Sequence, residues 1–191
     1  MERLFIELRK LHPVSQELEN YLRAHVLKKL YRKKDMILKE GQICRYVYFI
    51  ESGLVHHFST KSGKRVTTWL LGEHHFCVSF ESFFDSVPAE DNIQALENCI
   101  IWCITLDQLH EIFRLFPEFM RHVDLIKKKY RSIGEKIKVH LQGLGTKGKY
   151  LWFLDYHADI SNRVPLEIIA SYLGIAKNTL DRIRRDMAKP R

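Results

Sequence analysis

The sequence predicts an α+β protein built from three parts. We expect an N-terminal β-barrel domain over residues 1–116, a long dimerisation helix over residues 117–142 and a helix-turn-helix domain over residues 143–191. Three observations support this division: short strand-like runs between residues 30 and 105, a heptad pattern of apolar residues after Pro117, and two helix-like segments on either side of Gly174.

Composition narrows the class of protein. With 46% hydrophobic residues over 191 positions, the chain is typical of a globular protein rather than a disordered one. It has no apolar run of about 18 residues that could span a membrane, and its N-terminus does not have the pattern of a signal peptide. We therefore expect a cytoplasmic protein without a membrane partner.

Charge is distributed unevenly along the chain, whose formal net charge is +8. Residues 73–118 hold nine acidic side chains and one basic side chain, whereas residues 127–149 hold eight basic side chains and one acidic side chain. Residues 161–191 are also basic. A polyanion such as DNA would be attracted to this C-terminal third, although a solvated basic surface without a partner explains the charge equally well.

The N-terminal domain begins with a short amphipathic helix over residues 15–27, for which Ser15 is a candidate N-cap. Runs rich in β-branched and aromatic residues follow, separated by glycine turns. These runs are Met36–Leu38, Tyr46–Ile50, Leu54–Val55, Val66–Leu71 and Cys99–Ile104. Many short strands with glycine turns indicate an antiparallel barrel or sandwich over residues 30–105.

Helical periodicity returns at Leu106, and Pro117 separates a short helix from a longer one. Apolar residues recur along the longer helix with alternating gaps of four and three residues. This seam consists of Phe119, Val123, Ile126, Tyr130, Ile133 and Ile137. Because lysine and arginine occupy the other faces, we expect the narrow seam to pair with the same helix of a second copy. The alternative is a helix that lies on its own domain.

The C-terminal third starts with a glycine-rich linker over residues 143–148 and a helix over residues 149–156. The expected core residues of that helix are Tyr150, Leu151, Phe153 and Leu154. The stretch that follows has the pattern of a helix-turn-helix: Pro165 suits a first helical turn, small Ala170 permits a close crossing, and Gly174 permits a left-handed turn. Residues expected to be buried are Ile169, Ala170 and Leu173 in the first helix and Leu180, Ile183 and Met187 in the second.

The exposed face of the second helix, which begins near Ala176, is basic and polar. Its candidate DNA-contacting residues are Lys177, Asn178, Thr179, Arg182, Arg185 and Lys189. Arginine and asparagine can each form two hydrogen bonds to a base edge in the major groove. Thr179, Arg184, Arg185 and Lys189 are better placed for phosphates. The alternative is a helical hairpin with a charged face.

Several segments together resemble the Crp-Fnr family of bacterial regulators, in the form common in Bacteroidetes-type bacteria. They cover nearly the whole chain and comprise Tyr46–Val55, Thr67–Trp69, Glu81–Phe83, Ile93–Glu97, Phe116–Phe119 and the helix-turn-helix segment. The resemblance implies a double-stranded β-helix sensor (a jelly-roll barrel like that of cyclic nucleotide-binding domains), a long dimer helix and a winged helix-turn-helix that binds double-stranded DNA.

The resemblance also implies that Lys177, Asn178 and Arg182 occupy the recognition positions. Asp181 departs from the family, in which a small residue is usual there, and its charge would repel a phosphate. The sequence ends at Arg191, so we expect no wing strand after the recognition helix.

Cyclic-nucleotide-binding members of the family carry a Gly-Glu pair and then an arginine followed by Ser or Thr. Counting back from Ala95, these positions hold Val78-Ser79 and Ala89-Glu90, so the carboxylate for the ribose and the arginine for the phosphate are missing. We therefore expect no response to cyclic AMP or cyclic GMP. The pocket could take another small ligand or be vestigial. Its candidate residues are Val78, Ser79, Glu81, Ala89 and Glu90.

A metal-dependent barrel enzyme is a distant alternative, in which inward-facing His57, His75 and Glu81 would hold the metal. We expect no metal, cofactor or catalytic site, since the sequence has no Ser-His-Asp spacing, phosphate loop or paired-carboxylate motif. The four cysteines lack a Cys-x-x-Cys pair, and we expect them to be small buried hydrophobes. They are Cys44, Cys77, Cys99 and Cys103.

Together these features indicate a homodimeric, sequence-specific DNA-binding transcriptional regulator rather than an enzyme. The barrel would report a signal through the long helix to two recognition helices, and RNA polymerase is a further candidate partner. The alternative is a sensor or interaction module that binds an unidentified small ligand in the barrel and has weak or lost DNA binding.

Overall fold

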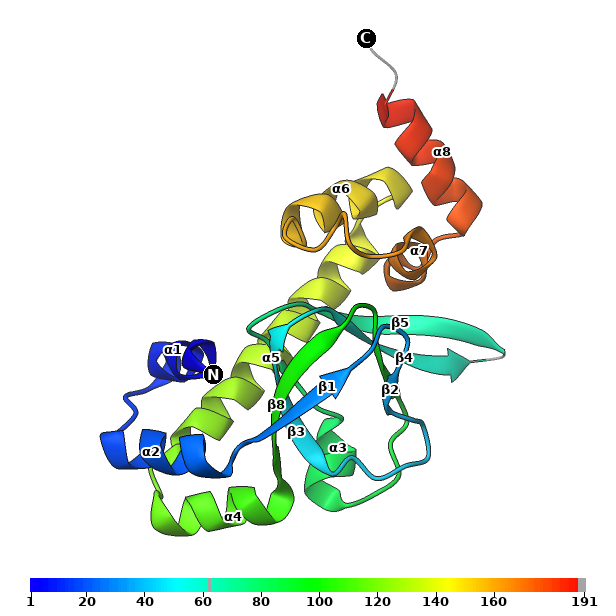
Figure 1. Cartoon of the computed structure of the whole chain (residues 1–191). Coiled ribbons are helices and arrows are strands. Elements are labelled where there is room, and N and C mark those ends of the chain that lie inside the picture. Colours follow the sequence, from blue (N-terminus) through cyan, green and yellow to red (C-terminus); the bar gives the residue numbers. More distant parts are fainter. Residues whose placement is uncertain (62, 189–191) are drawn as a thin grey trace.

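A computed structural model describes residues 1–61 and 63–188. In it a sandwich of two sheets lies against a long helix, and shorter helices gather at both ends of that helix (Figure 1). The helices are α1 (Glu2–Leu11), α2 (Gln16–His25), α3 (Phe80–Asp85), α4 (Leu106–Leu115), α5 (Phe119–Gly143), α6 (Thr146–Tyr156), α7 (Leu166–Leu173) and α8 (Lys177–Ala188). The strands are β1 (Leu27–Tyr31), β2 (Met36–Leu38), β3 (Tyr46–Ser52), β4 (Val55–Lys61), β5 (Lys64–Leu71), β6 (Phe76–Cys77), β7 (Asn92–Ala95) and β8 (Cys99–Thr105). None of the described helices is long and apolar enough to cross a membrane.

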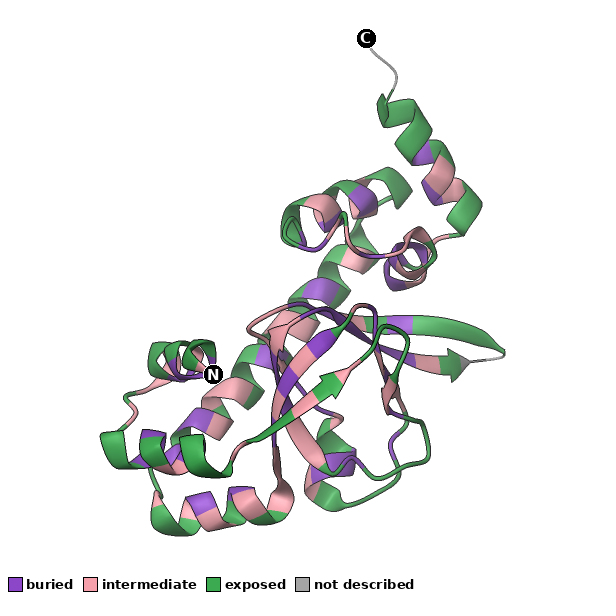
Figure 2. Ribbon diagram, in the orientation of Figure 1, coloured by how far each residue is buried: buried purple, intermediate pink, exposed green. Residues whose placement is uncertain are grey.

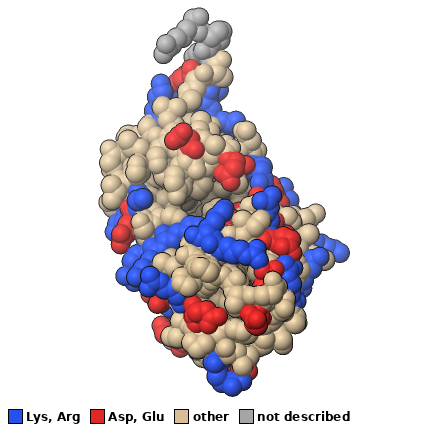
Figure 3. Space-filling model, turned by 90° about the vertical axis from the view of Figure 1, so that its left-hand side faces the viewer, with Lys and Arg blue, Asp and Glu red and all other residues tan. Residues whose placement is uncertain are grey.

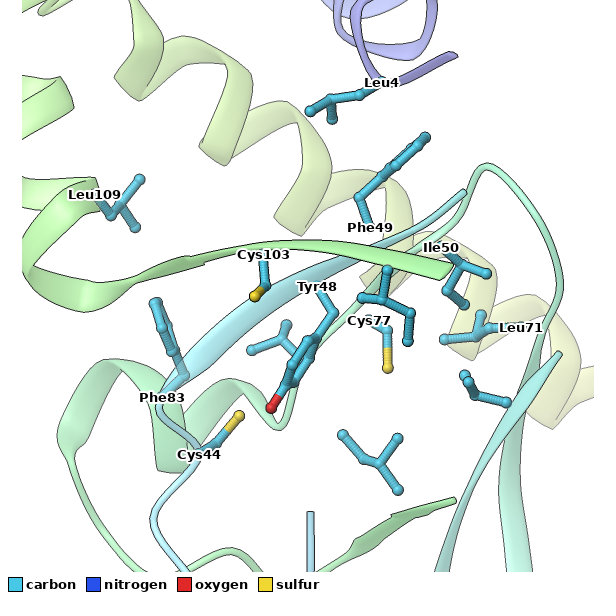
Figure 4. Close-up of a cluster of buried hydrophobic side chains, with 14 of the residues drawn as sticks. Leu4, Cys44, Tyr48, Phe49, Ile50, Leu71, Cys77, Phe83, Cys103 and Leu109 are labelled. Atoms are coloured by element: carbon cyan, nitrogen blue, oxygen red, sulfur yellow. The ribbon is translucent and has the colours of Figure 1, made fainter. Parts of the chain in front are cut away.

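The strands form two antiparallel four-stranded sheets, with the orders β1-β8-β3-β6 and β2-β7-β4-β5. In β8, Cys99, Ile101 and Cys103 are buried because alternate side chains of a strand point to the same face. Figure 4 shows Cys103 in the core near Tyr48. The predicted antiparallel sandwich is therefore confirmed, and so is the burial of all four cysteines, which are free thiols.

The N-terminal helices cover one end of the sandwich. The predicted helix after Ser15 is α2, and the Ser15 hydroxyl caps it by accepting a hydrogen bond from the Leu18 amide at 3.2 Å. The preceding α1 is absent from the sequence-based prediction. Its buried residues Leu4, Phe5 and Leu8 recur at helical spacing and pack into the core of the sandwich.

The apolar seam of α5 packs inside the chain (Figure 2). Phe119, Tyr130 and Ile137 are buried, and the other three seam residues are half-buried. The first four contact the core of the sandwich, whereas Ile133 and Ile137 contact the C-terminal helices. Val123, Ile126 and Ile133 thus keep part of their surface uncovered by their own chain, and the pairing of this seam with a second copy stays a prediction. The stripe is narrow because the sandwich and the C-terminal helices each cover only part of α5.

The C-terminal helices share a core with the sandwich rather than following a long linker. The linker predicted over residues 143–148 is reduced to residues 144–145, because α5 ends at Gly143 and α6 begins at Thr146. Tyr150 and Phe153 are buried as predicted, but Leu151 is 45% exposed, which corrects its assignment to the core. Leu54, Leu70 and Leu96 of the sandwich side pack in the same cluster as Phe153.

Two polar contacts also hold the C-terminal helices on the sandwich. The Ser171 hydroxyl of α7 accepts a hydrogen bond from the Thr67 amide at 2.9 Å and donates one to the Arg65 carbonyl at 2.8 Å, so it pairs with the edge strand β5. The Arg163 guanidinium donates to Glu73 at 2.7 Å and to Glu97 at 2.6 Å. The Arg163 hydrogen bond lowers the pKa of Glu73 to about 2, although partial burial opposes the shift.

Candidate nucleic-acid interface and cavity

The predicted pair of helices around Gly174 is present. Gly174 ends α7 in the left-handed region, with φ 63° and ψ 37°, which a residue without a Cβ adopts at little cost. The Ile175 amide then donates to the Ala170 carbonyl at 3.0 Å, and α8 starts at Lys177. Ala170 is buried in the same cluster as Leu180 and Ile183 of α8, which agrees with the close crossing expected of it.

The buried face of α8 is shorter than predicted. Leu180 and Ile183 are buried, but Met187 is 40% exposed. This corrects its assignment to the core. Its exposure follows from the position of α8, whose last turn extends away from α6 and α7 (Figure 1). The C-terminal half of α8 therefore has little of its surface covered by the chain.

The polar face of α8 is open to solvent. Lys177, Asn178, Arg182 and Arg185 are exposed, and Thr179 is half-buried. The Arg185 Nε donates to the main-chain carbonyl of Asp181 at 3.4 Å, so this arginine leans toward the middle of the helix. Lys189, the remaining candidate contact, lies outside the described residues. The structure thus places five of the six candidate residues on one helix.

Basic side chains are not confined to α8. Figure 3 shows Lys and Arg gathered in a band across the middle of one face of the molecule. The exposed positions of α5 contribute Lys127, Lys128, Lys129, Arg131, Lys136 and Lys138 to the surface. The basic charge that the sequence assigns to the C-terminal third is therefore solvent-exposed on two helices.

A cavity of about 540 Å³ lies between the sandwich, α3 and the middle of α5. Much of its lining is aromatic, and the rings come from Trp69, Phe76, Phe80, Phe84 and Tyr130. Its charged lining residues are Glu81, Asp85, Lys127 and Arg131, all of them exposed, so they form the rim of the cavity. The Lys127 ammonium lies 3.7 Å from the centre of the Phe84 ring, in a cation–π contact.

The candidate pocket residues divide into two groups. Val78 and Glu81 line the cavity, but Ser79, Ala89 and Glu90 do not. Ala89 is buried because its amide and carbonyl pair with the loop at Gln42 and Gly41, and Glu90 is exposed. The prediction is corrected for these three residues. The contribution of α5 to the cavity was missed, although the seam residue Tyr130 was singled out for another role.

Two polar residues, His57 and Cys77, line the inner wall of the cavity and belong to a hydrogen-bonded chain. His57 of β4 is 4% exposed, and its Nδ1 lies 2.7 Å from Asp91 Oδ2. Its Nε2 lies 3.1 Å from the Cys77 sulfur. The proposed metal set does not assemble: His75 contacts the Glu73 carbonyl at 3.0 Å, and in the described part of the chain no three His, Cys, Asp or Glu residues are grouped to hold a metal ion.

Comparison with known proteins identifies the fold of the sandwich. Residues 28–115 match the family described as the cyclic nucleotide-binding domain. The structure is similar to that of CLP, a c-di-GMP responsive global regulator of Xanthomonas campestris, with a TM-score of 0.74 and 16% identity over 91% of each chain. FixK2 from Bradyrhizobium japonicum has a TM-score of 0.74 and 15% identity, covering 85% of this chain and 84% of its own.

A regulator from Eubacterium rectale, named as a member of the crp/fnr family, has a TM-score of 0.73 and 16% identity, covering 91% of this chain and 83% of its own. No curated protein matches the sequence. At these identities the likeness establishes a shared fold, in which a cyclic nucleotide-binding-like sandwich is followed by a long helix and further helices.

Proposed function

We propose that this protein is a sequence-specific DNA-binding transcriptional regulator of the Crp-Fnr type that acts as a homodimer in the cytoplasm. The exposed polar face of α8 carries the proposal: Lys177, Asn178 and Arg182 are solvent-exposed near the start of a helix that is buried only on its opposite side. Residues at this end of a recognition helix reach base edges in the major groove. The fold shared with named regulators supports the same function.

The first test is selection of bound sequences from random duplex DNA with the purified protein at two salt concentrations. We expect a two-fold symmetric motif whose half-sites are about 34 Å apart. Binding that is weak, salt-sensitive and without sequence enrichment would contradict the proposal, because it would engage only the basic surface.

Arg182→Ala tests the recognition helix itself. We expect it to weaken binding to the selected site by about 1–3 kcal/mol, or roughly 5-fold to 150-fold, and to change binding to random DNA little. Arg114→Ala is the matched control, since Arg114 is an exposed arginine of α4 that pairs with Glu111. Equal losses of affinity for selected and random DNA would mean that Arg182 contacts phosphates rather than bases.

Besides the seam, whose pairing with a second copy stays a prediction, the face of α5 opposite the seam is open to a second copy. That face carries Lys128, Ser132, Glu135 and Val139, and Val139 is 66% exposed. Sedimentation of the purified protein and of Val139→Glu tests this arrangement. A dimer that the substitution does not weaken would place the contact elsewhere.

We further propose that the effector, if the cavity takes one, is not cyclic AMP or cyclic GMP. The two cations of the rim, Lys127 and Arg131, are accompanied by Glu81 and Asp85, so the rim does not single out a phosphate. Calorimetric titration with both nucleotides should give no binding. Micromolar binding of either nucleotide would overturn this proposal.

The alternative function is a sensor or interaction module with weak or lost DNA binding. The 540 Å³ cavity favours it, because a space of this size is enough for a small ligand. Ligand-dependent thermal stabilisation together with a failed DNA selection would support this alternative over the regulator.

A further inference from the structure

Cys77, His57, Asp91 and Ser79 form one hydrogen-bonded chain. The Cys77 sulfur lies 3.1 Å from His57 Nε2, and His57 Nδ1 lies 2.7 Å from Asp91 Oδ2. The Ser79 hydroxyl donates to the other oxygen of Asp91 at 2.6 Å. The chain therefore joins a nucleophile, a base and a group that orients the base, which is the arrangement that activates a nucleophile.

The direction of these hydrogen bonds fixes the imidazole tautomer. Burial raises the pKa of Asp91, but the hydrogen bonds from His57 and Ser79 outweigh burial, so that the pKa is lowered overall and the group remains a carboxylate. A carboxylate only accepts hydrogen bonds, so the proton of neutral His57 lies on Nδ1. The lone pair of Nε2 then faces the Cys77 thiol and can accept its proton.

The other cysteines have different surroundings. The Cys44 sulfur contacts the Tyr46 carbonyl at 3.3 Å, and the Cys99 sulfur contacts the Glu97 carbonyl at 3.3 Å. Burial raises the pKa of all four thiols, so each is neutral at rest and needs a base to react. Within the described residues, Cys77 is the cysteine whose sulfur contacts an imidazole.

Cys77 and His57 are 2% and 4% exposed, and the cavity beside them limits the shape of a reactant that can meet the thiol. Both Cys77 and His57 line it, and its rim is formed by exposed side chains. Aromatic rings from Trp69, Phe80 and Phe84 form much of the wall, which suits a flat apolar molecule rather than a large polar one. Figure 4 shows Cys77 and Cys44 within the same barrel core, which makes Cys44 a natural comparison.

We propose that Cys77 is a covalent modification site for small, flat α,β-unsaturated carbonyl compounds, with His57 as its base. The thiol gives its proton to His57 Nε2 as the sulfur forms a bond with the β-carbon. The π electrons of the C=C bond move to the α-carbon, which then takes the proton back from His57. The step is an addition of S–H across C=C, so it needs no oxidant and has no leaving group.

N-ethylmaleimide, an electrophile of this class, tests the proposal on the unaltered folded chain. The protein is treated with a small excess for increasing times, quenched and digested, and the adduct on each cysteine is quantified by mass spectrometry. We expect Cys77 to react at least about 10-fold faster than Cys44, Cys99 and Cys103. In 6 M guanidinium chloride the four rates should converge. A folded-state rate for Cys77 no greater than that of the other three would overturn the proposal.

Two variants distinguish activation of the thiol by a base from simple accessibility of the thiol as the cause of fast labelling. His57→Gln keeps the approximate volume but removes the base, and we expect it to slow Cys77 at least about 10-fold while leaving the other three rates unchanged. Asp91→Asn should decrease the labelling rate of Cys77 by a smaller factor. Circular dichroism and thermal melting identify variants that fail to fold. A folded His57→Gln protein that labels Cys77 at the original rate would show that His57 is not the base.

Discussion

The sandwich and the C-terminal helices are held together in different ways. The core of the sandwich is formed by residues up to Tyr130, including α1, α2 and the first half of α5. The cluster of the C-terminal helices includes Leu54, Leu70 and Leu96 from the sandwich side. The sandwich therefore completes its own core, whereas the C-terminal helices complete theirs by docking on the sandwich.

The two regions also place their polar groups differently. In the sandwich, His57, Asp91 and Ser79 hydrogen-bond to one another beside the cavity that His57 lines. On α8, Lys177, Asn178 and Arg182 face solvent. Polar groups that hydrogen-bond to one another inside the protein suit a region that binds a small molecule. Polar groups exposed on a helix suit a region that binds a large polar molecule. The sandwich is thus self-sufficient, whereas the C-terminal helices depend on it for their stability.

The largest effect is expected for Phe153→Ala, which empties a fully buried position of the C-terminal cluster. We expect a loss of about 3–5 kcal/mol in the unfolding free energy of residues 144–188. Hydrogen exchange should show those helices opening while the sandwich stays protected. The matched variant Phe83→Ala, in the core of the sandwich, should reduce protection in both regions. A uniform loss of protection with Phe153→Ala would mean that the two regions unfold as one unit.

Ala170→Leu should have the next largest effect. Ala170 is 3% exposed in the cluster that joins α7 to α8, so three added heavy atoms must displace its neighbours. We expect about 1–3 kcal/mol of destabilisation, confined to the C-terminal helices. Ala158→Leu is the control, since Ala158 is exposed in the same region. Equal melting temperatures for the two variants would contradict the close crossing.

Acid should destabilise the C-terminal helices through His157, whose Nε2 lies 3.0 Å from the Tyr172 hydroxyl. Burial lowers the pKa of His157 to about 4, so the unfolded chain, with a pKa near 6.5, takes up the proton first. Stability is therefore fully present above pH 6.5 and falls as the pH drops toward 4, by about 1–2 kcal/mol at pH 5.

His157→Gln should remove this pH dependence from residues 144–188. His56 gives the sandwich a similar dependence, because burial also lowers its pKa to about 4. Urea melts from pH 7.5 to 4.5, followed by hydrogen exchange, distinguish the two regions. If His157→Gln left the acid sensitivity of the C-terminal helices intact, another group would be responsible.

The smallest effect is expected for Glu73→Gln at the junction of the two regions. The Glu73 and Arg163 side chains are 29% and 32% exposed. We therefore expect the substitution to lower the unfolding free energy by only about 0.5–1 kcal/mol at pH 7. The pKa of Glu73 is lowered to about 2. The difference in unfolding free energy between variant and parent should therefore be at its maximum above pH 4.5 and disappear as the pH falls toward 2. A difference that is constant with pH would indicate lost packing instead of the ion pair.

Local patterns were sufficient to predict several parts of this molecule. The β-branched runs and glycine turns indicated the sandwich, Ser15 indicated the start of α2, and Gly174 indicated the turn between α7 and α8. These predictions succeed because each depends on the conformational preference of a few neighbouring residues. The exposed face of α8 was predictable for the same reason, since helical spacing alone separates it from Leu180 and Ile183.

Other features depend on residues that are far apart in the chain. The spacing of Phe119, Tyr130 and Ile137 defines an apolar stripe, but a stripe does not say whether its own chain or a second copy covers it. The cavity wall likewise joins β4, β6 and α5, and counting along the sequence placed Ala89 and Glu90 there wrongly.

The sequence by itself thus determined the helices other than α1 and α3, the sandwich and the polar face of α8, because these follow from local periodicity and turn chemistry. Only the tertiary structure decided which surface covers the seam of α5, which side chains meet at the cavity and that His57 lies between Asp91 and Cys77. The physical reason is that burial and hydrogen-bond pairing depend on long-range packing, which one-dimensional spacing does not specify.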